Sequence, residues 1–183
     1  MHGAAKRANQ PTGSAGKQGV RMSGDEQQAF YDDAAALRSE RLRDFHRQWV
    51  ESCGGAPYPG LAAIDPVRFK PFLADLVLVD VRDPKEPVFR LVGSGFNDFF
   101  TRPFSGEKVR NAAFPERELI LESYRQVALS GRPLLGWYRW HSEEGVTYHS
   151  EFVVLPFGDG KVERLLVMED LDPARQGRTT QPG

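Results

Sequence analysis

The sequence has a single cysteine and no long apolar run, and these two absences exclude several classes of protein. Because Cys53 stands alone among the 183 residues, the chain cannot be a disulfide-stabilised secreted scaffold. The longest apolar stretch, residues 72–81, contains Asp75 and Asp80 and is far too short to span a bilayer. The basic N-terminal residues are not followed by the apolar segment of a secretory signal. We therefore predict a cytoplasmic protein without a membrane segment.

The charged side chains are nearly balanced in number but unevenly distributed. Residues 1–24 hold four of the 24 basic side chains and none of the 25 acidic ones, so the remainder is acidic. An acidic folded part is a poor surface for nucleic acids or anionic membranes, and we expect neither as a partner. Residues 1–24 and 172–183 have few large apolar side chains, and we expect both to be disordered tails.

An amphipathic helix is predicted within residues 25–55. Large apolar side chains recur at helical spacing, at Phe30, Leu37, Phe45 and Trp49. Ser23 or Asp25 would cap the start, and the glycines at 54 and 55 would end the helix. The stripe is too apolar to remain in water, so its C-terminal half should cover one face of a sheet. Its N-terminal half is expected to pair with a second copy, which would make a homodimer.

Five strand-like segments follow, at residues 76–81, 88–93, 134–141, 148–156 and 162–169. Short turns containing Gly, Pro or charged residues separate the successive segments, which favours antiparallel hairpins. A short helix at 95–101 and a longer one at 115–130 lie between the second and third strands. This order predicts an α+β domain over residues 56–171, with one antiparallel sheet and helices on one face.

The expected hairpin loops predict how the last three strands pair. A loop at 143–145 places Arg139 opposite His149, and a loop at 158–160 places Phe152 opposite Leu166. Alternation then assigns one apolar face to Tyr138, Trp140, Phe152, Leu166 and Met168. It assigns the other apolar face to Leu135, Trp137, Val153, Leu165 and Val167. Both faces need cover, from the middle helices on one side and from the N-terminal helix or a partner subunit on the other.

Several short motifs, taken in order, resemble a bacterial family of stand-alone PAS proteins. They are Ala-Ile-Asp-Pro at 63–66, Leu-Val-Leu-Val-Asp-Val at 76–81, Phe-Arg-Leu-Val-Gly-Ser at 89–94, Phe-Ser-Gly at 104–106, Ser-Gly-Arg-Pro at 130–133 and Glu-Phe-Val-Val-Leu-Pro at 151–156. The resemblance covers residues 45–170, and it departs at Thr-Arg-Pro 101–103, where the family usually has Gly-Arg. It implies a PAS-like five-stranded antiparallel sheet and a sensory or regulatory role in signal transduction.

The resemblance also implies a ligand space between the middle helices and the sheet. The candidates for lining this space are six aromatic residues, Phe96, Phe100, Tyr124, Tyr138, Trp140 and Phe152. They would surround an apolar or planar small molecule, or they would simply fill the core. Haem and flavin are disfavoured, because the middle helices contain neither a histidine ligand nor a cysteine beside a flavin. The identity of any cofactor stays open.

A second group of candidates is polar and consists of Arg90, Arg139, His149 and Glu151. A buried Arg–Glu pair costs desolvation and is often kept for specificity or function. We prefer a structural salt bridge beneath the N-terminal helix over a ligand contact. His141 and His149 lie on neighbouring strands, but no third ligand converges on them, so no metal site is predicted.

Three functions are compatible with the sequence. The first is a PAS-type sensory or regulatory domain that binds a small molecule, a protein partner or both. The second is a ligand-free protein-interaction module that forms a dimer. The third is a small α+β enzyme that uses His149 and Glu151 as acid and base. The enzyme is disfavoured because no nucleophile, base and oxyanion site are clustered, and no catalytic residue is assigned. A roomy cavity would favour the first function and a filled one the second.

Overall fold

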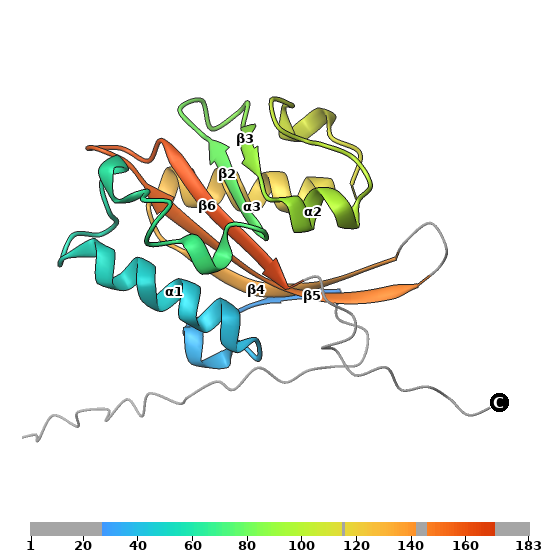
Figure 1. The fold of residues 1–183 in the computed structure, drawn as a ribbon, viewed down its shortest axis with the longest axis horizontal. Coiled ribbons are helices and arrows are strands. Elements are labelled where there is room, and N and C mark those ends of the chain that lie inside the picture. Colours follow the sequence, from blue (N-terminus) through green and yellow to red (C-terminus); the bar gives the residue numbers. More distant parts are fainter. Residues whose placement is uncertain (1–26, 115, 142–145, 171–183) are drawn as a thin grey trace, which may run out of the picture.

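The computed structural model describes residues 27–114, 116–141 and 146–170, which build one antiparallel sheet covered by helices (Figure 1). The strands are β1 (Gln28–Phe30), β2 (Leu76–Asp80), β3 (Val88–Val92), β4 (Leu134–His141), β5 (Thr147–Phe157) and β6 (Arg164–Asp170). Their order across the sheet is β1-β4-β5-β6-β2-β3. The α-helices are α1 (Glu40–Cys53), α2 (Ser94–Phe99) and α3 (Arg117–Ser130). Four single 3₁₀ turns complete the described elements, at Ala34–Ala36, Leu61–Ala63, Lys70–Phe72 and Val109–Asn111.

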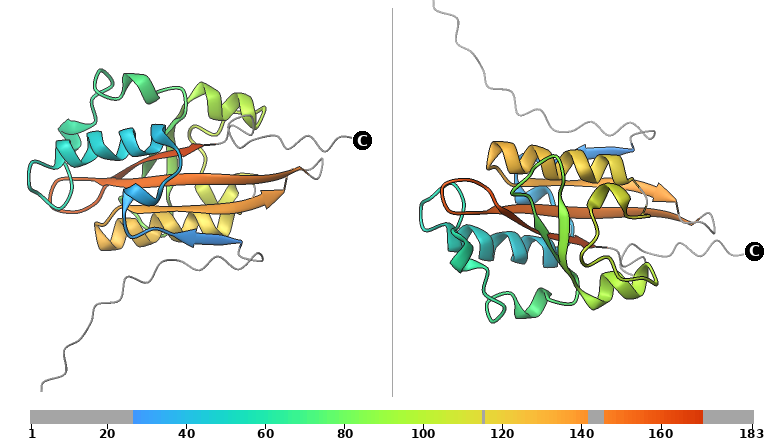
Figure 2. Two further views of the ribbon diagram at one scale, coloured as in Figure 1. Left: turned by 90° about the horizontal axis from the view of Figure 1, so that it is seen from below. Right: turned by 90° about the horizontal axis from the view of Figure 1, so that it is seen from above.

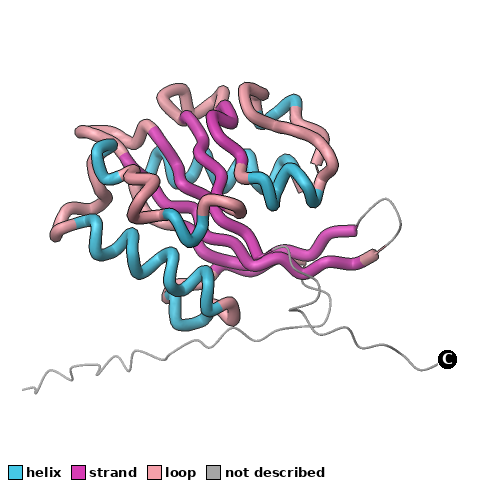
Figure 3. Tube along the Cα trace, viewed as in Figure 1, coloured by secondary structure: helices cyan, strands magenta, loops and turns pink. Residues whose placement is uncertain are grey.

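Helices cover both faces of the sheet, which agrees with the apolar character of both faces. Helix α1 lies on one face and α3 on the opposite face (Figure 2). We call the face beneath α2 and α3 the inner face, and the face beneath α1 the outer face. The predicted α+β fold with an antiparallel sheet is confirmed. A loop that contains two of the short turns connects α1 to β2 across the outer side (Figure 3).

The segment before α1 differs from the predicted long helix. Residues 28–30 form the edge strand β1, which pairs with β4 and brings Phe30 opposite Gly136. A side chain at Gly136 would approach the carbonyl oxygen of Ala29 to 2.4 Å, so the glycine permits this pairing. Helix α1 begins only at Glu40, where the hydroxyl of Ser39 accepts a 3.4 Å hydrogen bond from the Leu42 amide. The predicted caps at 23 and 25 and both predicted tails lie outside the described residues.

The C-terminal part of the predicted helix behaves as expected. Leu42, Phe45 and Trp49 are buried against the outer face, and the indole of Trp49 donates a 3.0 Å hydrogen bond to the carbonyl of Pro156. The helix ends at Gly54, which adopts a left-handed conformation with φ of 55°. The apolar stripe is therefore buried within its own chain from Leu37 onward.

Of the two registers predicted for the last three strands, the one between β4 and β5 is correct and the one between β5 and β6 is wrong. Arg139 lies opposite His149, as expected, but Leu155 rather than Phe152 lies opposite Leu166. This shift of three residues moves Leu165 and Val167 to the inner core and Leu166 and Met168 to the outer core. The expected three-residue turn is in fact a longer connection, because β5 continues to Phe157 and β6 begins at Arg164.

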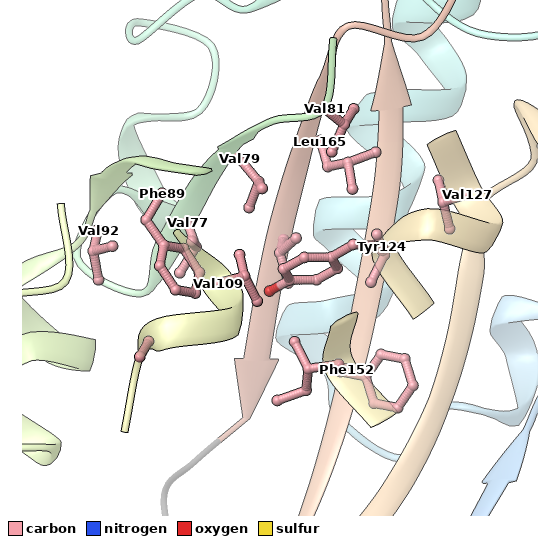
Figure 4. Close-up of a cluster of buried hydrophobic side chains, with 14 of the residues drawn as sticks. Val77, Val79, Val81, Phe89, Val92, Val109, Tyr124, Val127, Phe152 and Leu165 are labelled. Carbon is pink, nitrogen blue, oxygen red and sulfur yellow. The ribbon is translucent and has the colours of Figure 1, made fainter. Parts of the chain in front are cut away.

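The inner core joins the sheet to α3 and to the segment between the two middle helices. Figure 4 shows Tyr124 extending from α3 over the inner face, with Val109 beyond its hydroxyl end. Leu165 of β6 and Phe152 of β5 lie on the sheet beneath this helix. In the described part of the chain, no helix is long and apolar enough to cross a bilayer.

Candidate functional site

The six aromatic candidates all belong to the inner core, on the side where the resemblance placed a ligand space. Five of them are buried and Phe100 is partly buried. In the part of the chain that the structure describes, they form two groups of three rather than the lining of one pocket. Tyr138 and Trp140 face inward as predicted, because the register between β4 and β5 was correctly inferred. Whether these residues contact a ligand stays a prediction.

The first group packs ring against ring between α2 and the β4–β5 hairpin. The ring centroids of Phe96 and Phe100 are 4.8 Å apart, and Phe100 stacks on Trp140 at 6.0 Å. Trp140 in turn stacks on Tyr148 at 4.3 Å, while its indole donates a 2.9 Å hydrogen bond to the hydroxyl of Ser150. Stacked and edge-on rings at these distances fill the space as a close-packed core does.

The second group borders a very small cavity. Tyr124, Tyr138 and Phe152 line a void of about 10 Å³, which corresponds to the space of a single water molecule at most. The void is completed by Leu119, Ile120, Ser123, Val154, Val167 and Glu169. Two of these side chains, Ser123 and Glu169, carry oxygen atoms in addition to the two tyrosines, so the lining is partly polar.

Glu169 also belongs to this site, although it is not among the residues predicted from the sequence. The hydroxyl of Tyr138 donates a 2.7 Å hydrogen bond to the carboxylate of Glu169. Burial raises the pKa of Glu169 to about 7, although the bond from Tyr138 acts in the opposite direction. The predicted register placed the odd-numbered residues of the last strand on the outer face, and this error hid Glu169. A polar residue two positions after Val167, in correct register with Phe152, was the available signal.

The four polar candidates are not one cluster. Arg90 lies on β3 and binds Asp80, which also accepts from Arg82 and Arg164 at nitrogen-to-oxygen distances of 2.7–3.0 Å. Burial alone would raise the pKa of Asp80, but the three guanidinium groups hold it well below its usual range. A pairing of Arg90 with Glu151 is therefore wrong, because Arg90 is bound to a different carboxylate two strands away.

Glu151 instead anchors the chain that precedes α1. Its carboxylate accepts hydrogen bonds of 2.8–3.0 Å from the backbone amides of Arg38 and Ser39, and a 3.1 Å bond from the hydroxyl of Tyr31. Glu151 is 5% exposed, and its negative charge faces the positive end of the helix dipole. Glu151 therefore lies where a structural role was predicted, next to the N-terminal helix. Its partners are backbone amides and a hydroxyl rather than the predicted arginine.

His149 and Arg139 lie opposite each other on β5 and β4, as predicted. The imidazole of His149 stacks on Trp137 at 4.3 Å, and burial together with Arg38 lowers its pKa. Because both carboxylate oxygens of Glu151 already accept hydrogen bonds, the arrangement does not favour Glu151 as a base for catalysis. Among the described residues, no group of three or more His, Cys, Asp or Glu side chains is placed to hold a metal ion.

An open groove of about 1110 Å³ lies beside this anchor, along the N-terminal half of α1. Its lining includes Arg38, Asp44, Phe72, Glu151 within β5 and Asp170 at the end of β6. The lining carries both charge signs. The groove is not predictable from the sequence pattern, because it depends on how α1 and the Lys70–Phe72 turn meet the sheet.

Comparison with solved structures finds distant likenesses to sensory domains. A light-oxygen-voltage domain studied with a flavin analogue is 14% identical, with a TM-score of 0.44 over 60% of this chain and 86% of that chain. The PAS domain of Bordetella pertussis BvgS is 16% identical, with a TM-score of 0.41 over 63% and 91%. The photo-excited photoreceptor Vivid is 12% identical, with a TM-score of 0.43 over 69% and 94%.

The comparison of sequences is more informative. A search of curated proteins gives no match. A family model described as PAS domain, however, matches residues 37–168, which is most of the chain and extends from Leu37, just before α1, to Met168 in β6. The same stretch holds both cores and both faces of the sheet. The chain therefore belongs to the PAS domain family.

Proposed function

We propose that this PAS domain is a regulatory module in signalling that acts by binding another protein, with its interior serving as a packed core. PAS domains are typically sensory or signalling domains. The observation that carries the proposal is the cavity of about 10 Å³ beneath α3, which compares with roughly 300–1,000 Å³ for ordinary small-molecule pockets. A module with a filled interior needs another means of passing a signal, and a protein surface supplies it.

The packing around the cavity explains why a ligand would not enter easily. Phe152 contacts Phe30 and Tyr138, with ring centroids 6.3 and 5.8 Å away. On the α2 side, Phe99 and Phe100 extend the same core toward Trp140. A drug-sized ligand would have to displace several of these rings, and each displaced ring would lose its burial and its aromatic contacts.

The proposal is tested with the purified full chain and with a cavity-enlarged variant. Native mass spectrometry of the wild type should give the mass of the polypeptide, or a multiple of it, without a retained small molecule. The same spectrum reports whether the predicted homodimer forms. Indole should raise the unfolding temperature of Phe152→Ala, which has a cavity, and should leave the wild type unchanged. A wild type that retains a stoichiometric small molecule, or binds indole as its variant does, contradicts the proposal.

Small-molecule sensing is the second candidate, and one observation favours it. The Tyr138–Glu169 pair places a hydrogen-bonded carboxyl group at the edge of the cavity, where it would recognise a hydrogen-bond donor. If the wild type retains a ligand, Glu169→Gln should weaken its binding because the amide keeps the shape but loses the charge. A ligand whose affinity does not respond to this change would bind elsewhere.

A further inference from the structure

A β-bulge in β3 places Arg90 and Leu91 side by side on the outer face. Leu78 of β2 pairs with Leu91, and the next residue, Val79, pairs with Phe89, so that Arg90 is left over. The residues on either side of this pair are buried in the inner core, whereas Arg90 and Leu91 are both exposed. In a regular strand one of the two would point inward, and the bulge is what directs both outward.

Positive charge exceeds negative charge at this position, because two carboxylates, Asp80 and the nearby Glu163, face three guanidinium groups. Asp80 is the shared partner of Arg82, Arg90 and Arg164, and one carboxylate neutralises one of three positive charges. The side chains of Arg82 and Arg90 remain 54% and 47% exposed while they contact it. Both guanidinium groups therefore keep N–H donors in solvent beyond those that Asp80 accepts.

Two exposed apolar side chains lie along the same edge of the sheet, Leu91 next to Arg90 and Leu73 in the loop at the C-terminal end of β3. Leu91 is 44% exposed and Leu73 is 37% exposed. The loop that carries Leu73 is held against the end of β3, because the amide of Gly95 donates a 2.8 Å bond to the carbonyl of Ala74. Helix α1 buries its own apolar residues over β5 and β6, while β3 forms the far edge of the sheet (Figure 1). Exposed leucine beside exposed arginine is a composition typical of protein interfaces.

We propose that Arg82, Arg90, Leu91 and Leu73, which we call the bulge surface, bind a segment of a partner protein that carries carboxylates beside an apolar side chain. The inference rests on the proposed function, because it locates the protein-binding surface which that function requires. The excess of positive charge selects carboxylates, and Leu91 provides an apolar contact at the centre. The chain's own residues 1–24 are basic and are therefore unsuited to this surface.

The test uses the full chain and three fluorescein-labelled peptides in fluorescence anisotropy. The first peptide has several glutamates flanking one leucine, the second has serine in place of the leucine, and the third has lysines in place of the glutamates. The glutamate–leucine peptide should bind best. Arg82→Ala combined with Arg90→Ala should weaken its binding roughly fivefold or more. Leu91→Ser should weaken binding of the leucine peptide and leave the serine peptide unchanged.

Arg125→Ala is the matched control, because Arg125 is also half-exposed and pairs with a glutamate, but on α3. It should bind the glutamate–leucine peptide as the wild type does. The single variant Arg82→Ala leaves Arg90 and Arg164 on Asp80, so it provides a milder test if the double variant unfolds. Thermal unfolding of each variant establishes that the fold is retained.

Three results would overturn the bulge surface. The first is that the lysine peptide binds as tightly as the glutamate–leucine peptide. The second is that the arginine and leucine substitutions leave the affinity of the glutamate–leucine peptide unchanged. The third is that duplex DNA or phosphatidylserine vesicles bind equally or more tightly through the same arginines. In each case the mass spectra and the indole experiment still decide the proposed function. If the interior proves to be filled and the acidic peptide does not bind, the proposed function is retained, and the partner must bind another surface.

Discussion

A buried glutamate, Glu151, and a partly buried one, Glu169, lie on opposite faces of the same strand pair and show how differently the two faces are built. Glu151 on the outer face accepts bonds from two backbone amides and a tyrosine hydroxyl, and these fix the chain before α1. Glu169 on the inner face accepts a bond from Tyr138 beside a small cavity. The outer carboxylate is surrounded by donors that suit its charge. The inner one is surrounded mainly by apolar groups, which favour its neutral form.

This comparison suggests a division of roles. The outer face is a fixed attachment, in which α1 and its leading segment are held by apolar burial and by one carboxylate. The inner face holds a carboxyl group whose protonation changes near neutral pH. Five predictions test this contrast, beginning with the largest expected effect.

Removing the central aromatic ring of the outer core should produce the largest loss of stability. Phe45 is fully buried, and its ring contacts Phe69 and Phe72 at centroid distances of 5.8 and 5.3 Å. Phe45→Ala should lower the free energy of unfolding by about 3–5 kcal/mol in urea titrations. Val50→Ala, on the half-exposed side of the same helix, should change it by less than about 0.5 kcal/mol. Similar effects of the two substitutions would mean that α1 is not docked through Phe45.

Removing the outer carboxylate should have the next largest effect. Glu151→Ala leaves the amides of Arg38 and Ser39 and the hydroxyl of Tyr31 without their acceptor, which should cost about 2–4 kcal/mol of unfolding free energy. Glu40→Ala is the control, because Glu40 is exposed in the first turn of α1. Amide hydrogen exchange should show faster exchange of residues 31–39 in Glu151→Ala. Unchanged exchange there would contradict the anchoring role.

The inner carboxyl group should make stability depend on pH. The pKa of Glu169 is about 7 in the folded protein and near its model-peptide value of 4.5 in the unfolded chain, so the folded state binds the proton more tightly. Its contribution to stability is therefore complete below pH 4.5 and is lost as the pH rises through 7. The loss amounts to at most about 3 kcal/mol. Glu169→Gln should flatten this part of the profile, measured as unfolding free energy between pH 4.5 and 8.

Tyr138→Phe provides the complementary measurement for the same pair. The hydroxyl of Tyr138 lowers the pKa of Glu169 by donating to its charged form, so its removal should move the midpoint of the profile to higher pH. A profile that is identical in the wild type, Glu169→Gln and Tyr138→Phe would assign the pH dependence to other groups.

The smallest effect is expected from a single hydroxyl at the outer anchor. Tyr31→Phe removes one of the bonds to Glu151 but leaves the backbone amides in place, and it should cost about 0.5–1.5 kcal/mol. The difference from Glu151→Ala measures how much of the anchoring comes from the amides. If Tyr31→Phe is as damaging as Glu151→Ala, the hydroxyl rather than the amides holds the segment.

The parts of the fold that depend on local pattern were predictable from the sequence. Apolar spacing and turn residues predict helix α1 from its first buried residue onward. They also predict the strand positions and the pairing of Arg139 with His149. The length of the connection between β5 and β6 was not predictable in this way, because the connection is stabilised by a residue that is distant in the sequence. The amide of Gly158 donates a 3.0 Å bond to the carbonyl of Pro59, which belongs to the loop after α1. No pattern near residue 158 reveals that contact.

The missed features of the candidate site share the same cause. Residues 28–30 continue a helical pattern, but they become a strand because β4 offers a free edge about 100 residues later in the chain. The hydrogen-bond donors to Glu151 are not predictable from the side chains near it in the sequence, because they are the backbone amides of residues 38 and 39. Such donors exist at every position, so side-chain types alone do not identify them.

The order of the strands also governs when the chain can fold during its synthesis. Strand β6 lies between β5 and β2, so it joins the β4–β5 hairpin to the β2–β3 hairpin. Until residues 164–170 have left the ribosome, the two hairpins expose unpaired edges, and the pairing of β1 with β4 must wait until β4 has been made. The contacts that join the two hairpins therefore form only after nearly the whole domain has been translated, and the nascent chain is exposed to aggregation until the last strand enters the sheet.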